Sequence, residues 1–217
     1  MRPFDDIVRL ERAQALDRPA AALRGVVQRL LRNWTLKDAL HGVWLGHPLH
    51  PALAQIALGS FTSASLIDAV GGRRRGSSAL IAMGLASTVP TVAAGWADWS
   101  DSHEEQQRVG LVHAALNATA VACYTAALVR RRGDRGTGRL LSLVGGTLSV
   151  LGATLDGHLG YRQATGANHG EEVQHVGPEN WQLLGPIDEF PLDQPVRRLA
   201  GDVPVFVLRT LPGVSAS

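Results

Sequence analysis

The sequence predicts an all-α membrane protein: a four-transmembrane-helix bundle with an N-terminal amphipathic helical segment and a short C-terminal β-rich tail. Four apolar stretches are each about 20 residues long, which is the length that crosses about 30 Å of hydrocarbon. Charged residues make up only 18% of the chain, against about a quarter in soluble domains. Within the four stretches the charges Asp68, Asp98 and Asp156 lie near the ends. A soluble bundle would need a polar stripe along each helix, and the four stretches have none.

The first 46 residues predict the amphipathic segment. One helical face of residues 23–34 is apolar, with the spacing i, i+3, i+4, i+7, i+8 and i+11: Leu23, Val26, Val27, Leu30, Leu31 and Trp34. The opposite face carries Arg24, Gln28, Arg29 and Arg32. This pattern is typical of a helix that covers a protein core or lies in a membrane interface, and the apolar stretches that follow favour the interface.

Residues 47–166 predict the membrane domain, with spans at about 51–70, 78–98, 109–129 and 140–160. The spans are rich in Ala, Gly, Ser and Thr, and such small residues allow membrane helices to approach closely. The loops 71–77 and 130–139 together hold eight arginines. The positive-inside rule therefore predicts that both loops are cytoplasmic and that both termini are extracytoplasmic.

Residues 167–217 are polar and contain frequent Gly and Pro. Residues 203–209 alternate β-branched and other side chains, which predicts a strand. Two or three strands do not make an independent domain. The segment is therefore expected to pair with something else, or to be part of a domain that is cut short.

Charge and cysteine content exclude several classes of protein. The formal net charge is +2, which excludes a bulk nucleic-acid binder. The single cysteine, Cys123, excludes an internal disulfide and a thiolate metal cluster within this chain. No catalytic motif is visible, so the sequence leaves open whether the protein is an enzyme.

Histidines and carboxylates gather at the predicted outer ends of the spans. His47 and His50 precede the first span, with His50 as the expected N-cap before Pro51. The other members are Asp98 at the end of the second span, His113 and Asn117 in the third, and Asp156 and His158 at the end of the fourth. All of these residues except Asn117, which lies one turn further along the third span, are expected at one membrane depth, and polar groups within a span usually face the bundle interior.

Three chemistries fit this set of residues. His47, His50, His113 and His158 are the candidate ligands of a haem or a transition metal, and Asp98, Asn117 and Asp156 would support them. His158 is expected to be the hub, with His50 and His113 on either side. His–Asp pairs also suit a proton relay. The alternative is structural: each side chain is a helix cap or an interfacial hydrogen-bonding group.

Four separated motifs resemble a bacterial membrane family, domain of unknown function 2231. They are GHPLHPAL at residues 46–53, AGWADW at 94–99, VHAALN at 112–117 and GHLGYR at 157–162. The resemblance covers about residues 40–166. It implies a four-helix membrane domain and no established activity.

The tail is similar to the opening strands of a Rieske-type ferredoxin domain, best over residues 199–209 (LAGDVPVFVLR). A Rieske [2Fe-2S] centre needs two cysteines and two histidines, so no such cluster is expected in this chain. The resemblance implies a longer redox protein of which this chain holds the beginning of the iron–sulfur domain.

The first functional hypothesis is therefore the membrane module of an electron-transfer protein whose Rieske-type domain is incomplete here. The alternatives are a structural membrane anchor or assembly protein without a cofactor, and a small proton-relay or transport bundle. The expected partners are the lipid bilayer and either a redox partner protein or a second copy of the chain, with no nucleic acid.

Overall fold

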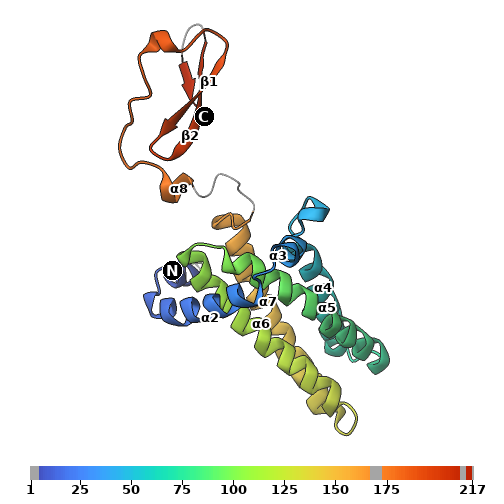
Figure 1. The fold of residues 1–217 in the computed structure, drawn as a ribbon. Coiled ribbons are helices and arrows are strands. Elements are labelled where there is room, and N and C mark those ends of the chain that lie inside the picture. Colours follow the sequence, from blue (N-terminus) through green and yellow to red (C-terminus); the bar gives the residue numbers. More distant parts are fainter. Residues whose placement is uncertain (1–4, 167–172, 211–213, 217) are drawn as a thin grey trace. The chain divides into compact units, whose positions relative to one another are not determined.

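The computed structural model describes residues 5–166, 173–210 and 214–216. The chain divides into two compact units, residues 1–166 and residues 167–217. The first unit contains all the long helices (Figure 1), and the second contains the strands.

Four long helices form the predicted membrane bundle: α4 (Leu49–Ala69), α5 (Arg74–Ser100), α6 (Glu104–Arg130) and α7 (Arg135–Gly157). Each is long and apolar enough to cross a bilayer, which confirms the four predicted spans. Helix α4 packs against α5 and α7, and α6 also packs against both, so the four helices close into a ring. One turn of π-helix, His158–Arg162, continues α7.

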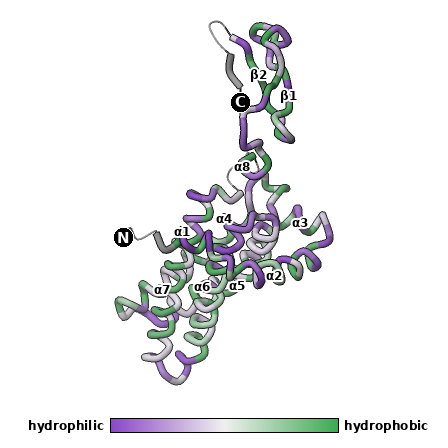
Figure 2. The backbone as a smooth tube through the Cα atoms, turned by 90° about the vertical axis from the view of Figure 1, so that its left-hand side faces the viewer, coloured by the Kyte–Doolittle hydropathy of each residue, from purple (hydrophilic) through white to green (hydrophobic). Residues whose placement is uncertain are grey.

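The outer surface of the bundle carries large apolar side chains, and its interior is lined by small residues. Figure 2 shows hydrophobic residues along the helices and hydrophilic residues gathered at their ends. Large side chains point outward, as Leu66, Val70 and Val89 do at 62%, 82% and 72% exposure. The buried positions of α7 are all small except for Leu155, and they repeat every three or four residues: Gly138, Ser142, Gly145, Ser149 and Gly152. This distribution is the one expected of helices surrounded by lipid.

Two stacked rings fill the centre of the bundle. Phe61 of α4 and Tyr124 of α6 lie 4.2 Å apart between ring centroids, with an angle of 8° between planes. The Tyr124 hydroxyl lies 2.9 Å from Ser65 Oγ, and it donates to the Phe61 carbonyl at 3.2 Å. Gly84 and Gly145 pack directly on these rings: an added Cβ would approach Phe61 to 2.6 Å and Tyr124 to 3.0 Å. The small residues are therefore required by the close approach of the helices.

The N-terminal segment is a set of short helices in the same unit: α1 (Asp5–Glu11), α2 (Asp17–Leu30) and α3 (Trp34–His41), with 3-10 turns at Gln14–Leu16 and Val43–Leu45. The continuous helix predicted for residues 23–34 is wrong. The chain breaks after α2, and the Asn33 side chain caps α3 by accepting from the Leu36 N–H at 3.2 Å.

The two faces of α2 are not used as the sequence predicts. Arg24 and Gln28, expected on the outer face, donate to the Ser100 carbonyl of α5 at 2.9 and 3.4 Å. Val27 is buried, whereas Leu30 and Trp34 are 73% and 76% exposed. The segment therefore binds the bundle end through polar side chains and presents apolar ones outward, as a helix in a membrane interface does.

The second unit is a small antiparallel sheet of strand order β1-β2-β3, with β1 (Pro195–Ala200), β2 (Val203–Arg209) and β3 (Val214–Ala216). The unit also holds a short helix, α8 (Val173–Val176), and a 3-10 turn, Ile187–Glu189. The strand predicted at residues 203–209 is confirmed. Phe190, Val203 and Val207 are buried and form its core.

Candidate metal centre

Three ligand-type side chains from three helices meet at one end of the bundle. They are His50 of α4, His113 of α6 and Asp156 of α7, and all three are half-buried. One ring nitrogen of each histidine and one carboxylate oxygen lie within 4.8 Å of one another. The three residues are not hydrogen-bonded to each other, so a gap separates their polar atoms.

The position of His50 is set by α5. Helix α4 begins at Leu49 with Pro48 as N-cap, so His50 is its second residue and not the predicted N-cap. His50 Nδ1 lies 3.0 Å from the Thr91 carbonyl of α5. Gly95, one turn further along α5, leaves room for the ring, because an added Cβ would lie 2.7 Å from Nδ1.

The position of His113 is set by α7. Its Nδ1 lies 2.9 Å from the carbonyl of Gly152. Asn117, one turn further along α6, donates from Nδ2 to the His113 carbonyl at 3.0 Å, and the same nitrogen lies 3.2 Å from His113 Nε2. An added Cβ on Gly152 would lie 2.9 Å from this amide, so the glycine allows α6 and α7 to approach here.

Both rings are held in the same tautomer. A backbone carbonyl only accepts hydrogen bonds, so the ring nitrogen that faces it must carry the proton. Nδ1 of both His50 and His113 is therefore the donor. The lone pair is left on Nε2 in each neutral ring. Histidines that bind metals commonly donate the other ring N–H to a carbonyl in this way.

Asp156 is a carboxylate near the end of α7. It forms no hydrogen bond or ion pair with any residue in the part of the chain that the structure describes. A carboxylate at the edge of a membrane span is costly unless a positive charge or a donor compensates it. Its side chain is therefore a ligand candidate that the rest of the protein does not use.

The other predicted site residues have different partners. His158, expected to be the hub, places Nε2 2.7 Å from Glu11 Oε1, and the position beside His50 and His113 belongs to Asp156. His47 is exposed, with Nδ1 3.2 Å from the Pro48 carbonyl. Asp98 lies 2.7 Å from His41 Nδ1.

His41 is a titratable residue that the sequence did not single out. Nδ1 faces Asp98 at 2.7 Å, and Nε2 faces Asp101 at 3.2 Å. The hydrogen bond to Asp98 raises the pKa of His41, and partial burial opposes this rise. His41 therefore joins the N-terminal segment to the end of α5, and protonation of its ring strengthens this contact.

Comparison with protein families agrees with this architecture. Residues 46–171 match the family described as "Predicted membrane protein (DUF2231)". The chain belongs to this family. The DUF2231 region contains α4 to α7 and all three residues of the candidate centre, and it ends before β1. No curated protein and no solved structure matches the chain.

Proposed function

We propose that this DUF2231 protein binds a transition-metal ion through His50, His113 and Asp156 and serves as the membrane module of an electron-transfer protein. The observation that carries the proposal is the pairing of two histidines in one tautomer with a carboxylate that has no other partner among the described residues. Iron, copper, nickel and zinc all accept imidazole and carboxylate ligands. Electron transfer selects iron or copper among them.

The distances suit a single ion. Metal–ligand bonds to imidazole and carboxylate are about 2.0–2.2 Å, so two ligands on one ion lie up to about 4.2 Å apart. The donor atoms within 4.8 Å of one another need only small side-chain shifts to reach this spacing. A haem between His50 and His113 fits less well, because an Asp156 carboxylate oxygen lies within 4.8 Å of a ring nitrogen of each histidine. The ion would replace the Asn117 amide beside His113 Nε2.

The proposal also covers the orientation of the bundle in the membrane and the origin of the C-terminal tail. The arginine-rich loops 71–77 and 130–139 are cytoplasmic, so the metal centre lies near the outer face, where a redox partner protein or a second copy of the chain would meet it. The proposal keeps a Rieske-like origin of the tail, which rests on the sequence resemblance of residues 199–209; the antiparallel β1–β2 pair is a feature of many β folds. The chain has one cysteine, so it does not supply the ligands of a [2Fe-2S] cluster itself.

A second candidate function is a structural anchor without a cofactor. The favouring observation is that each histidine joins two helices: His50 of α4 bonds to α5, and His113 of α6 bonds to α7. On this hypothesis the rings exist to fix helix packing, and Asp156 has no role.

Asp156→Asn separates the two functions, because it keeps the shape of the side chain and removes its charge. Purified protein should be titrated with Fe(II), Cu(II) and Zn(II), with metal content measured by elemental analysis. The metal proposal predicts a loss of affinity of at least about tenfold in Asp156→Asn. Asp38→Asn, an exposed change in α3, is the control and should bind as the original protein does.

His113→Ala should abolish binding and also lower the unfolding temperature, since it breaks the bond to α7. If no metal binds the original protein, or if Asp156→Asn binds as well as the original, the metal proposal is wrong. If His113→Ala then lowers stability and changes no metal binding, the result would support the structural-anchor hypothesis.

A further inference from the structure

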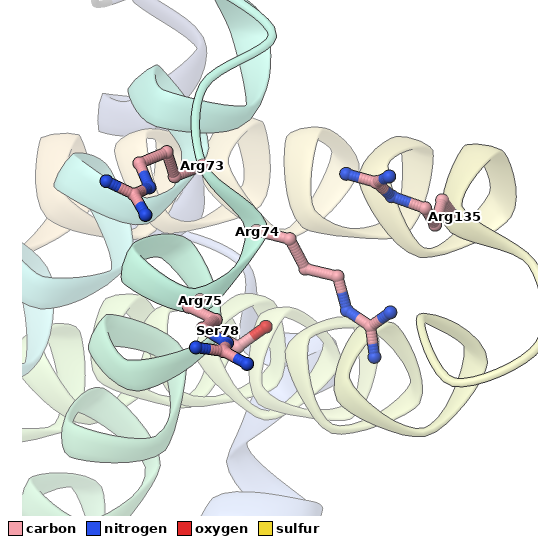
Figure 3. A pocket seen from close by; sticks show the side chains of 5 residues that line it. All are labelled: Arg73, Arg74, Arg75, Ser78 and Arg135. Atoms are coloured by element: carbon pink, nitrogen blue, oxygen red, sulfur yellow. The ribbon is translucent and has the colours of Figure 1, made fainter.

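The opposite end of the bundle contains a hollow of about 660 Å³ lined by Arg73, Arg74, Arg75, Ser78 and Arg135. Figure 3 shows that Arg73, Arg74 and Arg75 come from the beginning of α5, and that Arg135 comes from the beginning of α7. Residues 60 positions apart in sequence thus place guanidinium groups around one space. Its volume is within the range of about 300–1,000 Å³ that is usual for small-molecule sites.

The positive charge of this hollow is not compensated by the protein. Among the described residues, none of the four lining arginines forms an ion pair or a side-chain hydrogen bond. The two nearby carboxylates are already engaged. Asp68 is paired with Arg131, and Asp134 accepts from the Gly136 and Thr137 amides at 2.9 and 3.1 Å, which caps α7. Four exposed arginines without a carboxylate partner line one space, which favours an anionic ligand from outside the chain.

The backbone adds to the same preference. Helix α5 begins at the hollow, and the N-terminal end of a helix carries a partial positive charge. Arg73 is the N-cap of α5, and its side chain makes no capping bond, so the first amides of α5 also face this end without a side-chain acceptor. The Ser78 hydroxyl, 3.4 Å from Arg131 Nη1, offers a further donor to a ligand oxygen.

The position of the hollow near the expected membrane surface favours a lipid over a soluble anion. Exposed apolar side chains begin close to the arginines along the chain, with Val70 at 82% and Leu140 at 62% exposure. A phosphate bound by the arginines would therefore lie where hydrocarbon meets water, with its acyl chains along the bundle surface. Basic pockets between membrane helices bind the headgroups of anionic phospholipids in this manner.

We propose that this arginine-lined hollow binds the phosphate of an anionic phospholipid headgroup. Orientation by the positive-inside rule needs positive charge in the loops but no particular arrangement of it. In the proposed site, the planar guanidinium groups of Arg74 and Arg135 bind the phosphate through paired N–H bonds, a geometry that lysine does not reproduce. Charge and geometry can therefore be tested separately.

The test uses the full chain in nanodiscs of phosphatidylcholine that contain a small fraction of phosphatidylglycerol, followed by native mass spectrometry of the lipids retained. The expected result is retention of phosphatidylglycerol by the original protein and a loss of about tenfold or more in Arg74→Gln/Arg135→Gln. Arg74→Lys/Arg135→Lys should fall between the two, although its charge is unchanged. The control Arg18→Gln/Arg29→Gln removes two exposed charges from α2 and should retain the lipid fully.

Inorganic phosphate, added at millimolar concentration, identifies the source of the anion. Under the proposal it does not displace phosphatidylglycerol. Displacement at that concentration, or equal retention in the Gln double variant and the original protein, would overturn the lipid assignment. Equal retention in the Lys and original proteins would show that charge alone acts, which would also overturn the proposed bidentate site. Circular dichroism of each variant checks that the helices are intact.

Discussion

The two ends of the helix bundle differ in how their charged side chains are paired. At the histidine end, four basic side chains have carboxylate partners within the chain: His158 with Glu11, Arg108 with Asp17, Lys37 with Asp101 and His41 with Asp98, all at 2.5–2.7 Å. At the arginine end, eight arginines in two loops face two nearby aspartates. The pairs at the first end join the N-terminal helices to the bundle, whereas the lining arginines at the second end have no carboxylate partner among the described residues.

One pair at the arginine end is an exception, and breaking it should have the largest effect. Arg131 and Asp68 are paired with side-chain exposures of only 4% and 8%, and Arg131 Nη1 also donates to Ser77 Oγ at 2.7 Å. Arg131→Ala should lower the free energy of unfolding by about 3–5 kcal/mol, because it leaves a buried carboxylate without a partner. Thermal unfolding in detergent measures this change.

Arg132→Ala is the matched control, because Arg132 is the exposed neighbour in the same loop. It should change stability by less than about 0.5 kcal/mol. Equal effects of the two substitutions would mean that the Arg131–Asp68 pair does not hold α4 and α6 together.

At the histidine end, packing should matter next. Gly95→Ala places a methyl group 2.7 Å from His50 Nδ1, so the ring must move away from the Thr91 carbonyl. The expected loss of stability is about 1–3 kcal/mol. Metal affinity, if the proposed site is correct, should fall about 10–100-fold because the ring loses its orientation.

Gly59→Ala in α4 makes the same chemical change where nothing lies within 4 Å of the new methyl group. It should be neutral or stabilise the helix by up to about 1 kcal/mol. If both alanine variants behave alike, the close approach of Gly95 to His50 has no energetic importance.

The docking of the N-terminal segment should depend weakly on pH. The pKa of His41 is raised by its hydrogen bond to Asp98, so folding favours the protonated ring. Its contribution is complete below the ordinary value of 6.5 and is lost as pH rises through the higher pKa of the folded state. The loss should be about 1 kcal/mol or less, since the ring and the carboxylate are both partly exposed.

NMR titration of His41 between pH 5 and 9 measures this pKa, and limited proteolysis of residues 1–46 follows release of the segment. Asp98→Asn should return the pKa towards its ordinary value and remove most of the pH dependence. An unchanged titration in this variant would contradict the assignment of the shift to Asp98.

Single-cysteine labelling, which should perturb the protein least, tests which end of the bundle faces the cytoplasm. In a Cys123→Ala background, single cysteines at the exposed positions Gly76, Gly133 and Glu104 should leave the fold unchanged. We expect an impermeant thiol reagent to label only the cysteine at position 104 in intact cells. Labelling at positions 76 and 133 instead would invert the orientation.

The four helices were predictable because hydrophobic length is a local property of the sequence. Their ends were less so: α5 begins at Arg74, four residues before the predicted span, since long polar side chains can extend a helix beyond the hydrocarbon. The break between α2 and α3 depends on the Asn33 cap, a single side-chain bond that the apolar periodicity does not report.

The candidate site was only partly predictable. Residues two apart on a helix point about 200° apart, so Asp156 and His158 do not face the same neighbour. Helical geometry alone therefore excludes a shared position, but it does not say which residue faces His50 and His113. The choice depends on Glu11, 147 residues away, which binds His158. The roles of Thr91 and Gly152 rest on backbone carbonyls, which leave no signature in the sequence.

The seam of small residues in α7 has a consequence for the entropy of assembly. Burying Gly or Ala costs no side-chain rotamer freedom, whereas burying a long side chain costs up to about 2 kcal/mol. Inside a bilayer, lipid tails are as apolar as the helices, so no hydrophobic force drives the helices together. Weak van der Waals contacts at Gly145 and Gly152 can therefore hold the bundle, because little disorder is lost when the helices meet.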